Sequence, residues 1–458
     1  MAKKTKDSTL SIEERLEQAL IPNWDEPYKL PPNWCWTKLS SISAFERGIT
    51  FPASAKESLS LTTNIPCLRT ANVQESLELH DLLYVDRSYM KDNSDKLVRE
   101  NDIIMSTANS RELVGKTSFV HSLPEEMTFG GFIMAIRSKI NPKYLFYFLR
   151  LQFLNGKFMG NSTQTTNIAN INSTALGETE TPIPPLTEQE RIVSRIESLF
   201  AKLDEAKEKA QEVVDGFETC KAAILHKAFS GELTAKWREE NDVDISNYVK
   251  RRFDEVAIIK SNLVDPAEYQ NYPHIAPDNI EKKTGVLLEY HTIAEDGVKS
   301  GKHRFYPGQI LYSKIRPNLS KAVVVDFDGL CSADMYPIEA IGDAKCLWYF
   351  MLSENFLEQA SSAGSRSVLP KINQKELSAL TVTIPDSLEE QKEIANIIDS
   401  LFAKEYQVKE TAEAVIEQIA TMKKAILARA FRGELGTNDP SEESAVELLK
   451  KVLSGGEN

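Results

Sequence analysis

An internal repeat constrains the fold of this 458-residue chain more than any other feature of its sequence. Residues 189–233 and residues 391–435 align without gaps at a constant offset of 202 positions, and 22 of the 45 aligned residues are identical. Both copies contain SLFAK, and both end in AFSGEL or AFRGEL. Identity of this extent without gaps indicates that the chain is a duplication.

Each copy of the repeat is predicted to form one long helix. In the first copy, apolar or small residues follow one another at alternating gaps of four and three, which is the heptad pattern of a coiled coil. These residues are Ile192, Ile196, Leu199, Leu203, Ala206, Ala210, Val213, Phe217, Cys220 and Ile224. The second copy keeps the pattern, with Glu405 as its single polar interruption, and its apolar or small residues are Ile394, Ile398, Leu401, Val408, Ala412, Val415, Ile419, Met422 and Ile426. A narrow seam on a rod of roughly 64 Å needs a partner, and the other copy is the nearest candidate. The alternative is an ordinary amphipathic helix on a globular core.

The ends of these helices also carry signals. Thr187 and Glu190 have the spacing of a capping box after Pro184 and Pro185. Gly231 and Gly433 follow the last periodic residues, where helices usually end. We also expect residues 11–20, in the N-terminal extension, to be helical.

A globular segment precedes each long helix, and both segments are predicted to be mixed α/β. Strand-like runs occupy 102–107, 128–137, 309–315 and 321–327, and short helices occupy 143–154 and 346–357. Asn172 and Asn373 stand at matching places near the ends of the two segments. The predicted divisions are an N-terminal extension (1–29), a first globular domain (30–185), a first long helix (186–233), a junction with a second globular domain (234–385), a second long helix (386–435) and a C-terminal tail (436–458).

Composition excludes several classes of protein. The formal charge is −13, but residues 31–185 hold 15 basic and 15 acidic side chains and residues 246–385 hold 16 and 17. The acidic excess therefore lies outside the globular segments and does not exclude nucleic-acid binding by them. Five scattered cysteines without a CxxC pair, no zinc-ligand spacing, no secretory signal and no membrane-length apolar run favour a reduced, cytoplasmic protein.

Six segments of the chain carry a resemblance to a known family. In the first half they are LPPNWCWTKLSSI (30–42), IPCLRTANVQ (65–74), PIPPLTEQERIVSRIESLFAKLD (182–204) and KAAILHKAFSGELTAKWREEN (221–241). In the second half they are EEQKEIANIIDSLFAK (389–404) and KKAILARAFRGEL (423–435). These segments resemble the specificity (S) subunits of type I restriction-modification systems, whereas the globular segments match that family only in pattern.

The resemblance implies a fold and a function. The fold class is α/β (α+β), with two target recognition domains separated by two antiparallel coiled-coil helices and related by a pseudo-two-fold axis. Each domain would read half of a split sequence in double-stranded DNA. Two methyltransferase subunits would dock on the helices, and restriction subunits would join them. This chain would bind no cofactor itself, whereas its partners would use S-adenosylmethionine, ATP and Mg.

Base reading requires polar or cationic side chains that reach the groove edges, usually from loops. The first domain offers Arg69, Asn72, Thr107, Asn109, Ser110, Arg111 and Lys116, followed by Ser162, Gln164, Thr165 and Asn167. The second offers Lys299, Lys302, Arg304, Lys314, Arg316, Asn318 and Lys321, followed by Arg366 and Lys371. STANSRELVGK and SKIRPNLSK each follow a predicted strand and occupy corresponding places. The alternative for each residue is an ordinary solvated loop.

Rival functions lack their motifs. VGKTSFV (114–120) is not a phosphate-binding loop because Ser110 stands where that loop needs glycine. Carboxylates near lysines, such as Asp254, Glu255 and Lys260, are expected by chance in a chain this charged. No methyltransferase tetrad or nucleophilic constellation is present, so the chain alone is predicted not to be catalytic. Two other interpretations stay open: an enzyme with fused target domains, and a coiled-coil scaffold whose globular ends bind proteins.

Overall fold

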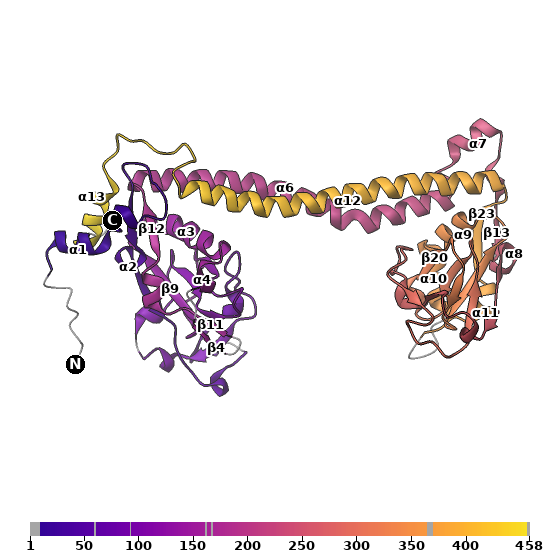
Figure 1. The fold of residues 1–458 in the computed structure, drawn as a ribbon, viewed down its shortest axis with the longest axis horizontal. Coiled ribbons are helices and arrows are strands. Elements are labelled where there is room, and N and C mark those ends of the chain that lie inside the picture. The colour runs from indigo at the N-terminus through magenta and orange to yellow at the C-terminus, as the bar shows by residue number, and fades with distance from the viewer. Residues whose placement is uncertain are drawn as a thin grey trace. The chain divides into compact units, whose positions relative to one another are not determined.

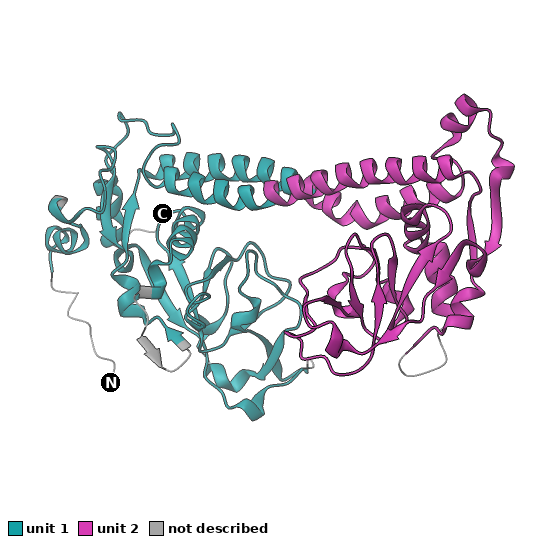
Figure 2. Cartoon of the chain, turned by 45° about the vertical axis from the view of Figure 1, so that its right-hand side comes forward, with its two compact units in different colours: residues 1–208, 416–458 teal, residues 209–415 magenta. Residues whose placement is uncertain are grey.

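The computed structural model describes residues 10–455 apart from 59–60, 92, 161–162, 166–167 and 364–369. The chain divides into two compact units (Figure 2). Unit 1 comprises Met1–Glu208 and Ile416–Asn458, and unit 2 comprises Lys209–Val415. Each unit holds one globular domain and parts of both long helices. Within the described ranges, no helix is both long and apolar enough to cross a membrane.

Two long helices run through both units, α6 (Leu186–Phe229) and α12 (Leu388–Ala430) (Figure 1). In unit 1 the start of α6 contacts the end of α12, because Ile192 and Leu427 share one core. In unit 2 the end of α6 contacts the start of α12, where the Phe217 and Tyr406 ring centroids are 4.9 Å apart. The helices are therefore antiparallel, and the predicted pairing of the two repeat copies is confirmed.

The predicted seam is wrong at four positions. Ala206 and Val213 in α6 and Val408 and Met422 in α12 are exposed. The buried positions Ala210 and Phe217 in α6 are one heptad apart, as are Ala412 and Ile419 in α12, and they alternate with exposed or half-buried seam positions. In this stretch only one seam residue of each heptad is therefore buried.

The predicted capping box at the start of α6 is also wrong. The helix begins at Leu186, so Thr187 lies inside its first turn, and the Thr187 hydroxyl donates to Glu442 Oε1 at 2.6 Å. The predicted stops are confirmed, because Gly231 and Gly433 follow the helices with positive φ values of 84° and 73°. A left-handed backbone of this kind favours glycine.

Each globular domain contains a four-stranded antiparallel sheet of the same strand order. In unit 1 the order is β2 (Ser43–Arg47), β9 (Ile133–Ser138), β5 (Ile103–Ser106) and β7 (Thr117–Phe119). In unit 2 it is β14 (Ala257–Ile259), β22 (Met335–Ala340), β19 (Ile310–Ser313) and β20 (Ala322–Val324). The central registers also correspond, with Ile103 opposite Ile136 and Ile310 opposite Ile338. The duplication therefore includes the globular domains.

A second sheet in each domain contains one parallel pair. In unit 1 the strands are β4 (Leu83–Asp86), β3 (Asn64–Leu68) and β8 (Thr128–Phe129). In unit 2 they are β15 (Leu263–Val264), β18 (Lys302–Phe305), β21 (Gly329–Cys331), β16 (Pro273–Ile275) and β17 (His291–Thr292). The parallel pairs are β3 with β8 and β16 with β21. Unit 2 adds β15 and β18, so its second sheet is wider.

Two predicted elements are interrupted. The run 128–137 divides into β8 and β9 at Gly130 and Gly131, and the predicted helix 346–357 spans the end of one helix and the start of the next. The larger helices of the domains are α3 (Pro142–Leu154), α9 (Ala344–Met351) and α10 (Glu354–Ala363). Shorter ones are α2 (Leu39–Ile42), α4 (Lys157–Gly160), α5 (Ser173–Gly177), α8 (Phe253–Val256) and α11 (Gln374–Ser378).

A two-stranded sheet closes each domain beside the start of its long helix. The pairs are β1 (Cys35–Lys38) with β12 (Glu180–Ile183) and β13 (Tyr248–Arg252) with β23 (Thr381–Pro385). Near the chain ends, α1 (Ile12–Ala19) has the predicted helical form, with a capping box at Ser11, and packs on α13 (Ala445–Leu453). The Arg15 guanidinium donates to the Leu453 carbonyl at 2.9 Å.

A buried glutamate in the first turn of each long helix joins it to the segment that follows the other helix. In unit 2, Glu390 is fully buried and accepts hydrogen bonds at 2.7 Å from Arg238, Thr234 and Asn247. Arg238 belongs to α7 (Ala235–Asn241), just after α6. A buried carboxylate is stable only when it is paired and hydrogen-bonded, and this one is.

Unit 1 repeats the arrangement with different partners. Glu188, the counterpart of Glu390, is fully buried and accepts from Trp34 and Asn438, each at 2.8 Å. The next residues, Gln189 and Gln391, are also equivalent, because each amide group donates to a carbonyl just before its helix. The TEQE and EEQK segments therefore attach each domain to the helix pair.

We predict that Glu390→Gln destabilises unit 2 more than Glu188→Gln destabilises unit 1. The first change leaves the buried guanidinium of Arg238 without its counter-charge, at a cost of about 3–5 kcal/mol. The second leaves neutral donors, at a cost of about 1–3 kcal/mol. Native-state hydrogen exchange should report the first loss at β13 and β23 and the second at β1 and β12.

The matched control is Glu339→Gln, which removes a half-exposed partner of Lys260. Its effect should stay below about 1 kcal/mol. Equal losses for the two buried glutamates would contradict the proposed role of Arg238.

Candidate nucleic-acid interface

Three backbone segments of unit 1 meet where the central strand β5 ends and its neighbour β9 begins. They are the loop after β5 (107–116), the turn between β8 and β9 (130–132) and the stretch through β11 (Ile168–Asn170) to Ile171. The Thr107 amide donates to the Phe132 carbonyl, and the Ile171 amide donates to the Thr107 carbonyl, both at 2.9 Å. We call these three segments loop surface 1.

Unit 2 repeats this convergence in loop surface 2, which comprises residues 314–321, 332–334 and 370–372. The Lys314 amide donates to the Asp334 carbonyl at 3.0 Å, and the Ile372 amide donates to the Lys314 carbonyl at 2.9 Å. The two polar clusters predicted from the sequence do occupy corresponding places. The Ser106 amide donates to the carbonyl of Lys116, and the Ser313 amide donates to that of Lys321, each at 2.9 Å.

The predicted DNA-binding residues differ in exposure. Those exposed on the loop surfaces are Ser110, Arg111, Arg316, Asn318 and Lys371, and those half-buried are Arg69, Asn109, Lys116, Arg304, Lys314 and Lys321. Arg316 has a positive φ of 49°. A non-glycine residue rarely adopts this strained conformation, which is often associated with function. The side chains of Gln164, Asn167 and Arg366 lie outside the described residues.

Three predicted residues are buried and serve the fold. The Asn72 side chain accepts from the Arg69 amide at 2.8 Å and donates to the Glu78 carbonyl at 3.0 Å, which holds the turn after β3. The Thr107 hydroxyl donates to the Phe132 carbonyl at 3.1 Å. Lys302 donates to Ser300 Oγ at 2.7 Å, and burial lowers the pKa of its ammonium group. These side chains are oriented into the protein.

All five half-buried cations have partners within their own domain. Arg69 is ion-paired with Asp81 at 2.8 Å, and Lys314 donates to the Ala333 carbonyl at 2.6 Å. Lys116 contacts the Gln74 side chain, and Lys321 donates to the Pro277 carbonyl at 2.6 Å, so each ties its loop to the turn after β3 or β16. The guanidinium carbon of Arg304 lies 4.8–5.9 Å from the ring centroids of three tyrosines, Tyr269, Tyr272 and Tyr306. Such cation–π contacts fix the direction of an arginine.

The sequence-based prediction missed a cleft beside loop surface 1. It has a volume of about 540 Å³, and its cationic lining residues are Arg47, Lys56 and Arg69. The Phe132 side chain lines it and is 62% exposed. Gly48 permits the close approach behind it, since a Cβ there would lie 2.2 Å from the Gly130 carbonyl oxygen. In the sequence, only the two glycines of FGGF (129–132) indicate a break at this place, and the prediction treated this segment as part of one continuous strand.

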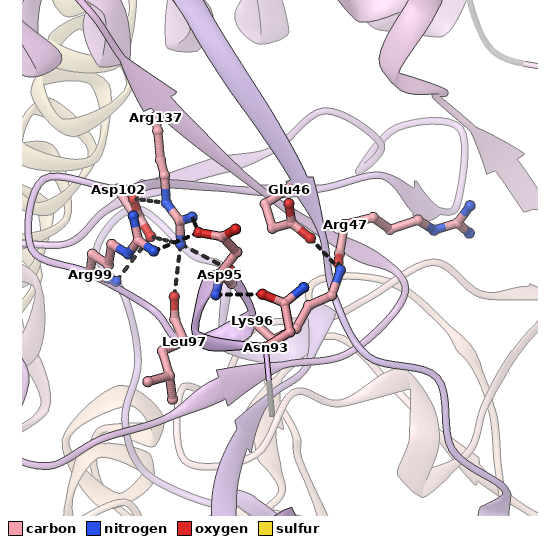
Figure 3. Close-up of polar contacts among 9 residues, drawn as sticks. All are labelled: Glu46, Arg47, Asn93, Asp95, Lys96, Leu97, Arg99, Asp102 and Arg137. Carbon is pink, nitrogen blue, oxygen red and sulfur yellow. Dashed lines mark hydrogen bonds and ion pairs between the residues drawn. The ribbon is translucent and has the colours of Figure 1, made fainter. Parts of the chain in front are cut away.

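A network of ion pairs and hydrogen bonds reaches the end of β2, whose last residue, Arg47, lines this cleft (Figure 3). Arg137 on β9 donates to Asp102 at 3.1 Å and to the Leu97 carbonyl at 2.8 Å. Burial raises the pKa of Asp102, although its partners oppose the shift. Lys96 contacts Glu46 and the Arg47 carbonyl, and the Arg47 side chain extends away from this network. The network therefore fixes the end of β2, from which Arg47 reaches the cleft.

A family model described as "Type I restriction modification DNA specificity domain" matches residues 31–214 and 245–418. The chain belongs to this family. It is 36% identical over 342 residues to the EcoDI specificity subunit of Escherichia coli, covering 68% of this chain and 76% of that one. It is 25% identical over 473 residues to the StySPI specificity subunit of Salmonella potsdam, covering 93% and 97%.

Solved structures share the fold of this specificity subunit. A chain from a type I R-M system superposes with a TM-score of 0.66 at 19% identity, covering 89% of this chain and all of that one. The HsdS subunit of Thermoanaerobacter tengcongensis gives 0.56 at 18% identity, covering 90% and 100%. A specificity subunit is non-catalytic, so the loop surfaces are candidates for recognition. Within the described residues, no group of three or more His, Cys, Asp or Glu could hold a metal ion.

We predict that Asn72→Ala and Arg111→Ala separate folding from recognition. Asn72→Ala leaves buried backbone groups without partners and should lower unit 1 stability by about 1–3 kcal/mol. Arg111→Ala removes an exposed cation, so unfolding should be unchanged while DNA binding by the assembled complex weakens. Thermal unfolding and salt-dependent DNA titration measure the two effects. If Arg111→Ala and the wild type bind DNA with equal affinity, Arg111 does not contact DNA.

Proposed function

We propose that this chain is the DNA-sequence specificity subunit of a type I restriction-modification complex and that it recognises a bipartite target. The observation that carries the proposal is the duplicated domain. The two units share one strand order and one convergence of loops, yet their exposed loop residues differ. Two such domains suit two half-sites of different sequence.

The antiparallel helices suit the symmetry of DNA. Antiparallel halves are related by an approximate two-fold axis, as are the two strands of a duplex. Each domain would then meet its half-site in an equivalent orientation. The unread spacer between half-sites should follow the length of the helices, because these connect the two domains.

The chemistry would belong to partner subunits. Two methyltransferase subunits would use S-adenosylmethionine to methylate an adenine in each half-site after flipping the base from the duplex. Restriction subunits would use ATP and Mg to cleave DNA whose adenines are unmethylated. The contribution of this chain is to place those subunits. The alternative is a scaffold whose globular ends bind proteins.

We predict that replacing residues 30–185 with the matching domain of another specificity subunit changes only one half of the target. The measurement is a genome-wide map of modified adenines after co-expression with the methyltransferase. The unaltered chain should give a split motif with a fixed gap, and the chimera should keep one half and the gap.

The second domain, residues 246–385, supplies the reciprocal exchange as a control. A chimera that altered both half-sites would contradict the proposal that each domain recognises its own half-site independently. A stable complex of the unaltered chain with an active methyltransferase that left no motif would favour the scaffold.

A further inference from the structure

One position of the duplicated loop surface carries opposite chemistry in the two units. Phe132 and Asp334 directly precede the equivalent strands β9 and β22. Their carbonyls accept equivalent hydrogen bonds, from Thr107 at 2.9 Å and from Lys314 at 3.0 Å. The backbone is therefore the same, whereas one side chain is aromatic and the other is a carboxylate.

The surroundings of Phe132 match DNA. An exposed fraction of 62% is high for phenylalanine, so the fold itself does not require this side chain. The walls of its cleft carry Arg47, Lys56 and Arg69, and none of the described residues that line it is a carboxylate. Because Arg69 is ion-paired with Asp81 at 2.8 Å, Arg47 and Lys56 supply the net positive charge of the cleft. Apolar contact beside a cationic rim suits a base edge flanked by phosphates, whereas an acidic or mixed rim would suit a protein surface better.

The surroundings of Asp334 suit a hydrogen bond to a base. The carboxylate lies 3.2 Å from the Lys371 ammonium and 3.6 Å from that of Lys314, and its side chain is 39% exposed. The two lysines hold it in place on loop surface 2. A carboxylate accepts from the exocyclic amine of cytosine in the major groove, and phenylalanine contacts the methyl group of thymine.

We propose that this position determines specificity in both domains: Phe132 contacts a thymine methyl group in one half-site, and Asp334 accepts from a cytosine amine in the other. The inference rests on the proposed function, because it assigns base classes to the same recognition surfaces. It gives the two halves of the target different chemical requirements.

The test for Phe132 uses the complex with its methyltransferase and duplexes in which each thymine of the first half-site is replaced in turn by deoxyuridine. Wild-type affinity should fall about fourfold at one thymine, the effect of one buried methyl group. Phe132→Ala should bind both duplexes equally. Leu61→Ala, another exposed apolar residue of unit 1 at 55%, should keep the fourfold difference.

A first half-site without thymine, or specific binding indifferent to every thymine methyl, overturns this assignment while leaving the proposed function intact. Absence of any sequence-specific binding refutes the proposed function instead. The assignment is also overturned if the Phe132→Ala complex assembles normally and keeps the methyl effect. That result is expected if Phe132 contacts a protein and not DNA.

The test for Asp334 uses Asp334→Ala in the same complex. Discrimination against other bases should fall roughly fivefold to a hundredfold at one cytosine of the second half-site, and the first half-site should be unaffected. The matched control is Glu339→Ala, which removes a half-exposed carboxylate from β22, the strand that Asp334 precedes. Unchanged discrimination at every cytosine overturns the second assignment.

Discussion

The structure depends on two carboxylates that are buried at the starts of its long helices. A buried carboxylate must have partners, and Glu188 and Glu390 find them in the segments after the opposite helix. Each therefore joins three parts of the chain: a domain, the start of one helix and the end of the other. The same glutamate and glutamine recur at an offset of 202 because both junctions solve the same problem.

This arrangement explains why the globular domains diverged from each other further than the two long helices did. Residues of the helices and their junctions are constrained on several sides, and 22 of 45 aligned positions remain identical. The exposed side chains of the loop surfaces meet fewer constraints, because backbone hydrogen bonds and a few buried or half-buried side chains hold the loops. The carbonyl of residue 132 or 334 accepts one such bond whatever its side chain is. The frame can thus stay constant while the recognised chemistry changes.

The sequence predicted the features that depend on periodicity and repetition, namely the duplication, the helix pair, the glycine stops and the corresponding loops. Sequence-based prediction failed where contacts between residues far apart in the chain determine the position of a side chain. Thr187 looked like a cap, but Glu442 is its partner. Asn72 and Lys302 were predicted to reach DNA from loops, but both are buried in their folded domains. Phe132 looked like a strand residue, because only the tertiary approach of Gly48 to Gly130 shows that the strand is broken there.

The loop surfaces are also tied to the helices, which bears on how the spacer can change. In unit 1, Lys423 of α12 contacts Glu75, next to the Gln74 that holds Lys116. In unit 2 its counterpart Lys221, 202 positions earlier, is buried against aromatic rings and points to the Lys283 carbonyl at 3.4 Å. Each residue added to a helix rotates the remainder of that helix by about 100°. Because the domains cannot swivel freely on these contacts, a workable change in spacer length must lengthen both helices together, by insertions that restore the apolar seam.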